Sequence, residues 1–301
     1  AIGGVIQIFT RKGDVGITPY AKVGYGTHNS KQVAAGLSGG NEATRYSVNI
    51  NHESTDGINA KKNVNPDKDG YRNNSFSAKM NHQINEKVDV GFNFIRIEGE
   101  NESDPRSSKT DTNTSDSVQQ IFGINSSLAI NDIWAVSVQL SESRDQSKNF
   151  ENTSVLSEIN TRHRAANLTN LIHLTGEQTL NIGFDYDIDD IDATENYVKT
   201  SRDNKAVFIS WQGAIDKQEW VVSARHDDNE AFGSENTGNA EYGYWLQDDL
   251  RVSLNAGTAF KAPTFNDLYW PADAYTAGNP DLVPETSKSF EYIPILLDKI
   301  L

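Results

Sequence analysis

Residues 257–291 read GTAFKAPTFNDLYWPADAYTAGNPDLVPETSKSFE and are the most informative stretch for the fold. Just before them, Val252, Leu254 and Ala256 alternate with polar residues, which is typical of a β-strand with one apolar face. A long segment rich in proline, glycine and aromatic residues follows, and a second strand is expected after Pro284. The stretch therefore predicts a strand, a long loop and another strand.

The composition of the 301 residues limits the class of protein. Only 36% of them are hydrophobic, and no apolar run approaches the roughly 20 residues that a membrane-spanning helix needs. The net charge of −15 argues against a nucleic-acid partner, because phosphate binding requires basic patches, and it suits a surface that binds cations. The absence of cysteine fits a barrel without disulfides, and residues 1–11 lack the pattern of a secretory signal.

From Thr18 onward the chain reads as a series of strands of roughly ten residues, each with one apolar and one polar face. The clearest are residues 46–51, 88–94, 134–140 and 180–186. Roughly ten residues is the length of a tilted strand that crosses a bilayer. A soluble sheet also alternates, so this pattern alone leaves the membrane and soluble alternatives open.

The connections between these strands alternate in length. Short turns are expected at residues 39–42, 85–87, 131–132, 176–178, 216–217 and 247–249, and longer polar loops at 54–72, 99–116, 144–159, 189–203, 226–238 and 261–284. Short turns on one side and long loops on the other are typical of an outer-membrane barrel. We therefore predict an all-β, antiparallel transmembrane β-barrel with about 14 strands present.

Two short motifs in the quoted stretch resemble the signature of TonB-dependent outer-membrane receptors. The first motif comprises Gly257, Thr258, Phe260, Lys261, Ala262 and Pro263, and the second comprises Gly278, Asn279, Pro280, Leu282, Pro284, Glu285 and Ser287. Further similarity, through AIGGVIQIFT, PDKDGYRNNS and EWVVSARHDDNEAFG, is greatest to the cobalamin receptors of that family. An ordinary loop of a soluble β-protein is the alternative.

The resemblance implies a division of the chain into three parts. Residues 1–13 resemble the last strand of the family's plug domain, and residues 14–291 resemble part of its barrel. Residues 292–301 are expected to be an atypical tail produced by truncation or a frameshift. A complete receptor barrel has about 22 strands, so the sheet is expected to be incomplete and open. A short helix at 292–301 and an ordinary N-terminal strand at 1–13 are the alternatives.

The acidic loop Asn65-Pro66-Asp67-Lys68-Asp69-Gly70 resembles the first half of an EF-hand. Its twelfth position is Phe76 instead of a glutamate, so other loops must complete a calcium shell of six to eight oxygens. Asp56, Asp111 and Asp116 are the candidate carboxylates of these neighbouring loops. Resemblance to the cobalamin receptors implies Ca²⁺ bound by Asp67, Asp69, Asp56 and Asp111. A solvated acidic turn without metal is the alternative.

No enzymatic motif fits the predicted strands. Residues 36–40 match the G-x-S-x-G pattern of a nucleophile elbow, but that motif requires a strand followed by a helix, and a hairpin is predicted here. The six histidines lack metal-ligand spacing. The carboxylates of Asp185, Asp187, Asp189 and Asp190 are expected to line the barrel lumen or meet solvent, with paired glycosidase carboxylates as the alternative.

The family resemblance implies a non-enzymatic receptor of the bacterial outer membrane that takes up cobalamin or another large nutrient with TonB-coupled energy. Its expected partners are the nutrient, the TonB protein and outer-membrane lipid or lipopolysaccharide, with no nucleic acid. The substrate-binding residues are not predicted. A siderophore receptor, a passive porin and a secreted calcium-binding β-protein are the alternatives.

Overall fold

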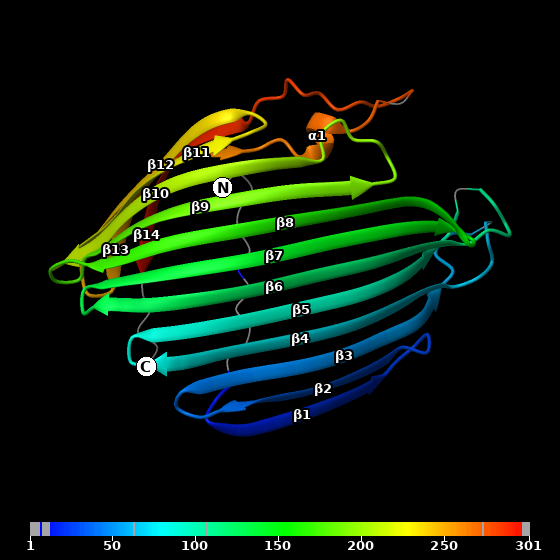
Figure 1. The fold of residues 1–301 in the computed structure, drawn as a ribbon, viewed down its shortest axis with the longest axis horizontal. Helices are drawn as coiled ribbons and strands as arrows, with labels where there is room; N and C mark the ends of the chain where they lie inside the picture. Colours follow the sequence, from blue (N-terminus) through cyan, green and yellow to red (C-terminus); the bar gives the residue numbers. More distant parts are fainter. Residues whose placement is uncertain (1–6, 8–12, 63, 106, 273, 297–301) are drawn as a thin grey trace.

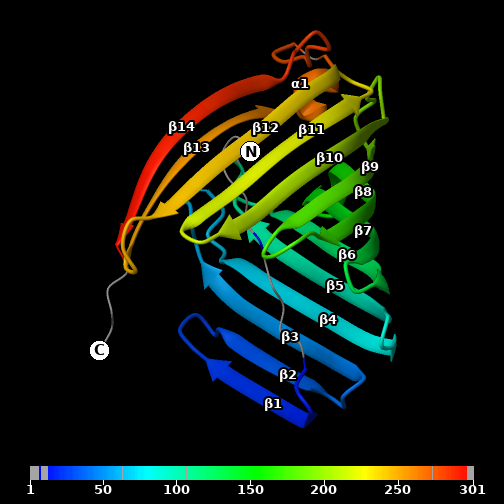
Figure 2. The same ribbon diagram turned by 90° about the vertical axis from the view of Figure 1, so that its left-hand side faces the viewer.

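The computed structural model describes residues 7, 13–62, 64–105, 107–272 and 274–296. Over these residues the chain forms one antiparallel sheet of fourteen strands, each paired with its neighbours in sequence. The sheet curls into an open trough with β1 and β14 at its two edges (Figure 1 and Figure 2). The all-β fold and the number of strands are as predicted.

The strands run in chain order from β1 to β14. Their bounds are β1 Gly16–Tyr25, β2 Lys31–Gly40, β3 Thr44–Ile58, β4 Asp69–Asn85, β5 Val88–Ser103, β6 Asn113–Asn131, β7 Trp134–Glu151, β8 Ser154–His173, β9 Thr179–Ala193, β10 Ser201–Ile215, β11 Gln218–Asn229, β12 Gly233–Trp245, β13 Leu250–Lys261 and β14 Glu285–Leu296. A short helix, α1 Phe265–Tyr269, lies between β13 and β14. No helix within the described ranges is long and apolar enough to cross a membrane.

One face of the sheet carries a band of apolar side chains, and we call it the apolar face. Val138, Leu168, Phe184 and Val207 stand side by side on β7 to β10 and are between 39% and 54% exposed. Because successive residues of a strand point to opposite faces, the alternation seen in the sequence collects these side chains on one side. An apolar band of this extent requires a non-aqueous neighbour, and a transmembrane barrel finds it in lipid.

Aromatic side chains border the apolar band at the end of the sheet with the short turns. Trp134 begins β7, and Trp211, Trp220 and Tyr242 lie near the same ends of β10, β11 and β12. The rings of Trp211 and Trp220 pack edge to face with centroids 5.2 Å apart. Tryptophan and tyrosine are enriched at membrane interfaces, so these side chains mark one boundary of the band.

The opposite, polar face is lined by amides, hydroxyls and charged groups. Arg225 on β11 forms ion pairs there with Asp185 of β9 and, at 3.0 Å, with Asp227. The ring of Phe208 covers Gly183 on the neighbouring strand so closely that a Cβ atom at Gly183 would lie 2.2 Å from it. Glycine is therefore required at this position for the aromatic ring to lie against the sheet.

In several short turns an asparagine side chain accepts hydrogen bonds from the backbone in the same way. The Oδ1 atom of Asn85 accepts hydrogen bonds from the backbone N–H groups of Lys87 and Val88, at 2.9 and 3.0 Å. Asn131 and Asn41 bind the backbone two and three residues ahead in the same way. Each side chain replaces a backbone partner in the turn, which fixes the register of the hairpin that follows.

Two of the predicted long loops are wrong. In place of the loop at 144–159, β7 and β8 continue to a two-residue turn in which Asn152 has a φ of 55°. In place of the loop at 226–238, β11 and β12 are separated only by residues 230–232. Most side chains of these segments are polar, and they still pair across the strands, as Asn149 does with Ser157 at 3.0 Å. Polar composition therefore marks strand extensions into water and not loops.

The predicted tail at 292–301 is wrong for its first half, because β14 continues through residues 292–296. Leu250 of β13 pairs with Leu296, and Val252 pairs with Pro294. A proline is tolerated here because β14 is an edge strand, where one row of backbone groups needs no partner within the sheet. Residues 297–301, and residues 1–6 and 8–12 of the predicted plug strand, lie outside the described residues.

The long connection between β13 and β14 folds back on itself around α1. Thr264 caps the helix by accepting a hydrogen bond from the Asp267 N–H at 3.1 Å, and the Asp267 carboxylate accepts from the Thr264 N–H at 2.8 Å. The pKa of Asp267 is lowered below its usual value by hydrogen bonds with Thr264, of which the bond with the hydroxyl has the larger effect and the bond with the backbone the smaller. Leu268 is 1% exposed, so this short helix has a buried anchor.

The second motif docks on the same helix. The N–H of Gly278 donates to the Trp270 carbonyl at 2.9 Å, and that of Asn279 donates to the Asp267 carbonyl at 2.8 Å. A Cβ atom at Gly278 would lie 2.6 Å from the Trp270 nitrogen and 2.7 Å from the Leu268 carbonyl. The two motifs are therefore joined through α1, and glycine at 278 permits the close approach.

We predict that Gly278→Ala releases this loop while the sheet stays folded. The added methyl meets fixed backbone atoms, an overpacking that typically costs about 1–3 kcal/mol. Limited proteolysis of the protein in detergent should then cut within residues 262–284 faster than in the wild type. Gly26→Ala is the matched control, because its Cβ would find an ordinary contact at 3.6 Å. Equal cleavage of the two variants would contradict the proposed docking.

Candidate functional site

Three aspartates gather where the β3–β4 and β5–β6 loops meet. Oxygen atoms of Asp67, Asp69 and Asp104 all lie within 4.8 Å of one another. Backbone N–H groups hold two of these carboxylates: that of Ala60 donates to Asp69 at 2.8 Å, and that of Lys61 donates to Asp104 at 2.8 Å. We call Asp67, Asp69 and Asp104 the acidic cluster.

The loops around the acidic cluster contain acceptors without a donor. Oδ1 of Asp104 and Oδ1 of Asn59 are buried and have no hydrogen-bond partner among the residues that the structure describes. Asn65, which is 7% exposed, links the two loops by donating to Asp67 at 2.8 Å and to the Asp111 carbonyl at 3.0 Å. Buried oxygens that lack donors are the groups a hard cation such as Ca²⁺ uses as ligands, so the donor set fits this metal.

The other aspartates of the predicted calcium set have protein partners elsewhere. Asp56 lies 3.7 Å from the Lys68 ammonium and accepts a hydrogen bond from Asn29 at 3.2 Å. The Asp111 carboxylate accepts a hydrogen bond from the Asn152 side chain at 2.9 Å. Its pKa is lowered by hydrogen bonds with Ser108, which has the larger effect, and with Asn152. The structure therefore brings Asp67 and Asp69 together, adds Asp104, and reaches Asp111 through its carbonyl.

Asp116 and Asp104 differ from the sequence-based expectation in opposite ways. Asp116 lies on β6 opposite Glu100, next to the pairing of Glu100 with Arg72, and is not part of the cluster. Asp104 is absent from the predicted set, although an aspartate before Pro105 in an outer loop is a weak signal. Its proximity to Asp67 depends on how two neighbouring hairpins pack, which no local motif encodes.

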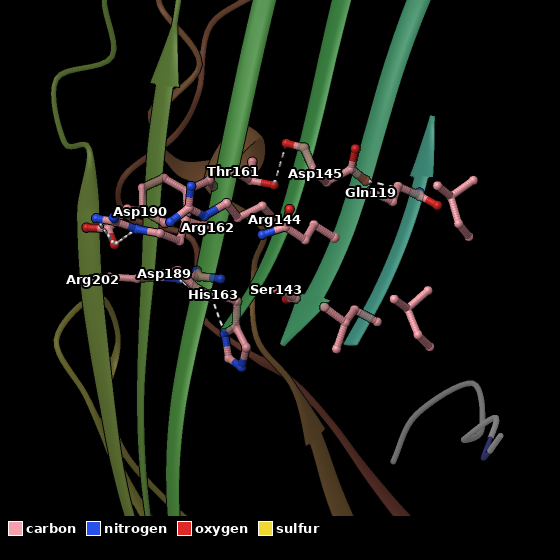
Figure 3. Close-up of a pocket in the computed structure, with 15 residues that line it drawn as sticks. Gln119, Ser143, Arg144, Asp145, Thr161, Arg162, His163, Asp189, Asp190 and Arg202 are labelled. Carbon is pink, nitrogen blue, oxygen red and sulfur yellow. Dashed lines mark hydrogen bonds and ion pairs between the residues drawn. The ribbon is translucent and has the colours of Figure 1, made fainter. Parts of the chain in front are cut away.

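A cleft of about 470 Å³ opens on the polar face below the β13–β14 loop (Figure 3). Ile95, Ile97 and Ile121 form an apolar part of its wall, and His163, Asp189 and Arg202 form a charged part. Nδ1 of His163 lies 2.8 Å from Asp189, and Nε of Arg202 donates to the same carboxylate at 3.1 Å. The cleft therefore offers both apolar contact and hydrogen-bonding groups, as binding sites for organic molecules do.

Arg202 also fixes the loop above the cleft. Its Nη1 donates to the Pro263 carbonyl at 2.9 Å, and its guanidinium carbon lies 4.8 Å from the centre of the Phe265 ring. Its side chain is only 14% exposed, so these contacts are shielded from water. One arginine thus joins the wall of the cleft to the first motif and to α1.

The β9–β10 loop supplies further contacts to the same segment. The Tyr197 hydroxyl donates to Asn266 at 2.7 Å, and the Tyr197 ring packs edge to face with Trp270 at 5.9 Å. Burial raises the pKa of Tyr197. The hydrogen bond to Glu230 raises the pKa of Lys199, and the Lys199 ammonium lies 5.9 Å from the centre of the Tyr269 ring. The loop between β13 and β14 is therefore held to the polar face by aromatic and charged contacts.

The strand residues of the first motif have packing roles. The Thr258 hydroxyl accepts a hydrogen bond from the Gly238 N–H at 3.0 Å, and Phe260 packs against Phe232 with ring centroids 5.9 Å apart. Lys261 lies 3.6 Å from Glu285 of the second motif. The G-x-S-x-G segment at 36–40 lies within β2 and leads into β3, so it has no nucleophile-elbow geometry.

Residues 14–292 match the family described as TonB dependent receptor-like, beta-barrel. The chain is 31% identical over 295 residues to the vitamin B12 transporter BtuB of Photobacterium profundum, covering 97% of this chain and 48% of that protein. It is 32% identical over 315 residues to that of Vibrio vulnificus, covering 98% and 49%. The chain thus spans about half the length of these relatives.

Solved structures share the fold at low sequence identity. A ferric enterobactin receptor mutant (Q482A) from Pseudomonas aeruginosa, in complex with enterobactin, has a TM-score of 0.71 at 14% identity and covers 96% of this chain and 53% of its own. The copper transporter OprC has a TM-score of 0.70 at 14% identity, with 94% and 51% covered. With fourteen antiparallel strands in its described residues, an apolar band and a match over residues 14–292, the chain belongs to the TonB-dependent receptor β-barrel family of outer-membrane proteins.

Proposed function

We propose that this chain forms part of the barrel of a receptor that takes up cobalamin across the outer membrane with energy from TonB. The observation that carries the proposal is the identity of 31–32%, over nearly the whole chain, to two proteins named vitamin B12 transporters. The receptor performs no covalent chemistry in this account. It binds the nutrient at the long-loop end and passes it through the lumen that the polar face lines.

The cleft on the polar face supports a role in binding a large amphipathic nutrient. Its isoleucines offer apolar contact, while His163 and Asp189 offer hydrogen bonds. The β13–β14 loop closes one side of the cleft and is held in place by Arg202. A loop that is ordered before the ligand arrives reduces the entropy lost on binding, so these contacts favour affinity.

Calcium is a second part of the proposal. Asp67, Asp69 and Asp104 would supply carboxylate oxygens to Ca²⁺, with the buried Oδ1 of Asn59 nearby in the same pair of loops. Asp56 and Asp111, the other members of the predicted set, would support these loops through Lys68 and Asn152. The metal would offset repulsion among the three carboxylates and hold two outer loops in one arrangement.

We predict that Arg202→Ala weakens cobalamin binding roughly 10- to 100-fold. Removing this side chain releases the β13–β14 loop, and the loss of a hydrogen bond from a charged group costs about 1.5–3 kcal/mol. The measurement is equilibrium binding of cyanocobalamin to the purified full-length protein in detergent. Lys205→Ala is the control, since Lys205 lies on the same strand and pairs with Asp203 on the opposite face. If the wild-type protein binds a ferric siderophore and does not bind cyanocobalamin, the assignment of cobalamin as the substrate is wrong, whatever the variants show.

We predict that Asp104→Asn lowers calcium affinity about tenfold or more, as do Asp67→Asn and Asp69→Asn, because each variant removes charge from a cation site. Titration calorimetry with Ca²⁺ measures the effect directly. Asp116→Asn should bind calcium as the wild type does, because Asp116 is outside the cluster. If cyanocobalamin binds equally well with calcium and with chelator, calcium does not order the ligand site.

A further inference from the structure

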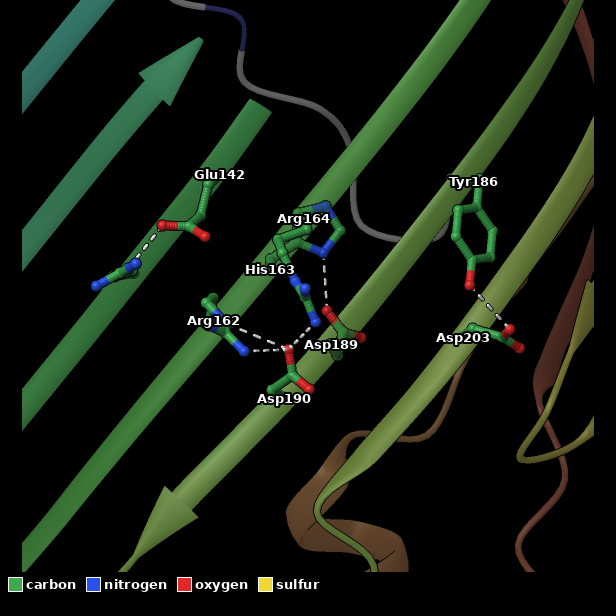
Figure 4. Close-up of polar contacts among 9 residues, drawn as sticks. Glu142, Arg162, His163, Arg164, Tyr186, Asp189, Asp190 and Asp203 are labelled. Atoms are coloured by element: carbon green, nitrogen blue, oxygen red, sulfur yellow. Dashed lines mark hydrogen bonds and ion pairs between the residues drawn. The ribbon is translucent and has the colours of Figure 1, made fainter. Parts of the chain in front are cut away.

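His163 stands in the charged wall of the cleft with one of its two ring nitrogens held. Nδ1 lies 2.8 Å from Oδ1 of Asp189 (Figure 4), and because an ionised carboxylate only accepts, Nδ1 carries the donated proton. Nε2 has no hydrogen bond within the described ranges; it lies 3.6 Å from Oδ1 of Asp187, which is too long for one. In the neutral imidazole the lone pair of Nε2 is therefore unused.

The partner of Nδ1 is itself fixed, so the imidazole has a set orientation. Nε of Arg202 donates to the other oxygen of Asp189 at 3.1 Å, and Nη1 of Arg202 donates to the Pro263 carbonyl at 2.9 Å. Histidines that bind metals in proteins typically donate their other N–H to a carboxylate, which fixes the tautomer and raises the basicity of the ligating nitrogen. His163 therefore has the arrangement of a histidine that ligates a metal through Nε2.

The side chains around Nε2 are too few to hold a free metal ion, which usually takes three or four protein ligands. Over the described part of the chain, the acidic cluster in the outer loops is the one group of three or more acidic or histidine side chains close enough to share an ion. Asp187 lies near Nε2, but Asp185, the next carboxylate along this face of β9, is engaged by Arg225. A metal that meets Nε2 must therefore arrive with most of its ligands in place.

Cobalamin, the nutrient proposed above, carries such a metal. Its corrin ring and lower base hold the cobalt at every position except one axial position, and in aquacobalamin an exchangeable water occupies that position. Ser143 lies directly opposite His163 on β7, and Ile121 follows on β6, so a small side chain and an apolar one flank the imidazole. The His163 side chain is 46% exposed, so a flat ring can approach it from the cleft.

We propose that His163 ligates the cobalt of aquacobalamin through Nε2, an inference that rests on cobalamin as the substrate. The Co–O bond breaks and the water leaves with its electron pair, while the lone pair of Nε2 forms the new Co–N bond. The proton on Nδ1 stays in the hydrogen bond to Asp189, and the oxidation state of cobalt does not change. The exchange is reversible, because water takes the axial position again when the cobalamin leaves.

This ligation makes the receptor selective for the axial ligand of its nutrient. Cyanide binds cobalt too tightly for imidazole to displace it, so cyanocobalamin binds through the other contacts of the cleft alone. Aquacobalamin also carries an additional positive charge, because water is neutral and cyanide is an anion. The Asp187 carboxylate beside Nε2 therefore favours aquacobalamin as well.

The test compares aquacobalamin with cyanocobalamin on the purified full-length protein in detergent. The visible absorption spectrum of aquacobalamin should shift on binding in the direction that free imidazole produces in solution, whereas the spectrum of cyanocobalamin should not. Loss of a group that merely supports a metal ligand typically costs about 10- to 100-fold in metal affinity. Aquacobalamin, which gains the ligand itself, should therefore bind at least roughly tenfold more tightly than cyanocobalamin.

His163→Gln keeps a hydrogen-bonding side chain but removes the imidazole. It should abolish the spectral shift and bring the affinities for the two cobalamins within about twofold of each other. Binding of cyanocobalamin to this variant shows that the variant is folded. His226→Gln is the matched control, because His226 pairs with Val207 on the apolar face, and it should keep both the shift and the preference.

Two results overturn the role of His163 and leave cobalamin as the substrate. The first is binding of both cobalamins to the wild type without a spectral shift, and the second is a shift that persists in His163→Gln. If the wild type binds neither cobalamin, the proposed function is wrong, and so is the inference that rests on it.

Discussion

The backbone hydrogen bond between neighbouring strands is the interaction on which the rest of this structure depends. A chain that crosses lipid must satisfy every backbone N–H and C=O group internally, because each unpaired group costs several kcal/mol there. The fourteen strands meet this demand by pairing in sequence order, which leaves only β1 and β14 as edges among the described residues. Once the ladder is set, the period of two distributes side chains between a lipid-facing and a lumen-facing surface.

The two surfaces and the long-loop end have separate tasks. The apolar face carries the apolar band and the aromatic boundary. The polar face carries the charged wall of the cleft, where Arg202 joins Asp189 to Pro263. Beyond the membrane, the acidic cluster joins two loops. The cleft and the apolar band thus lie on different faces of the same strands.

Much of the fold could be predicted because strand alternation is a local signal. The segment 180–186 shows it clearly, and β9 includes that segment. The extensions of β7 and β8 could not be predicted because both of their faces are mostly polar beyond the membrane, so they lack the regular alternation of the membrane-spanning part. The end of β14 could not be predicted because Pro294 indicates a strand break, whereas an edge strand tolerates it.

The sites were harder to predict than the strands because they depend on register. Asp104 joins Asp67 through the packing of separate hairpins, and His163, Asp189 and Arg202 meet only when β8, β9 and β10 pair with the right offset. A slip of one residue in either pair would move His163 or Arg202 to the apolar face. By contrast, the two motifs at 257–263 and 278–287 could be located from sequence, although their mutual contact through α1 could not.

One face of the sheet contacts lipid, and the other lines a water-filled lumen. The chain contains no cysteine, so single cysteines can be placed at each position from 165 to 172 on β8 without background. Spin labels at these positions, in the protein reconstituted into bilayers, report exposure to oxygen in lipid and to a water-soluble nickel chelate. We expect strict alternation, with even positions accessible to oxygen and odd positions accessible to the chelate. Uniform accessibility along this segment, or a period near 3.6, would contradict it.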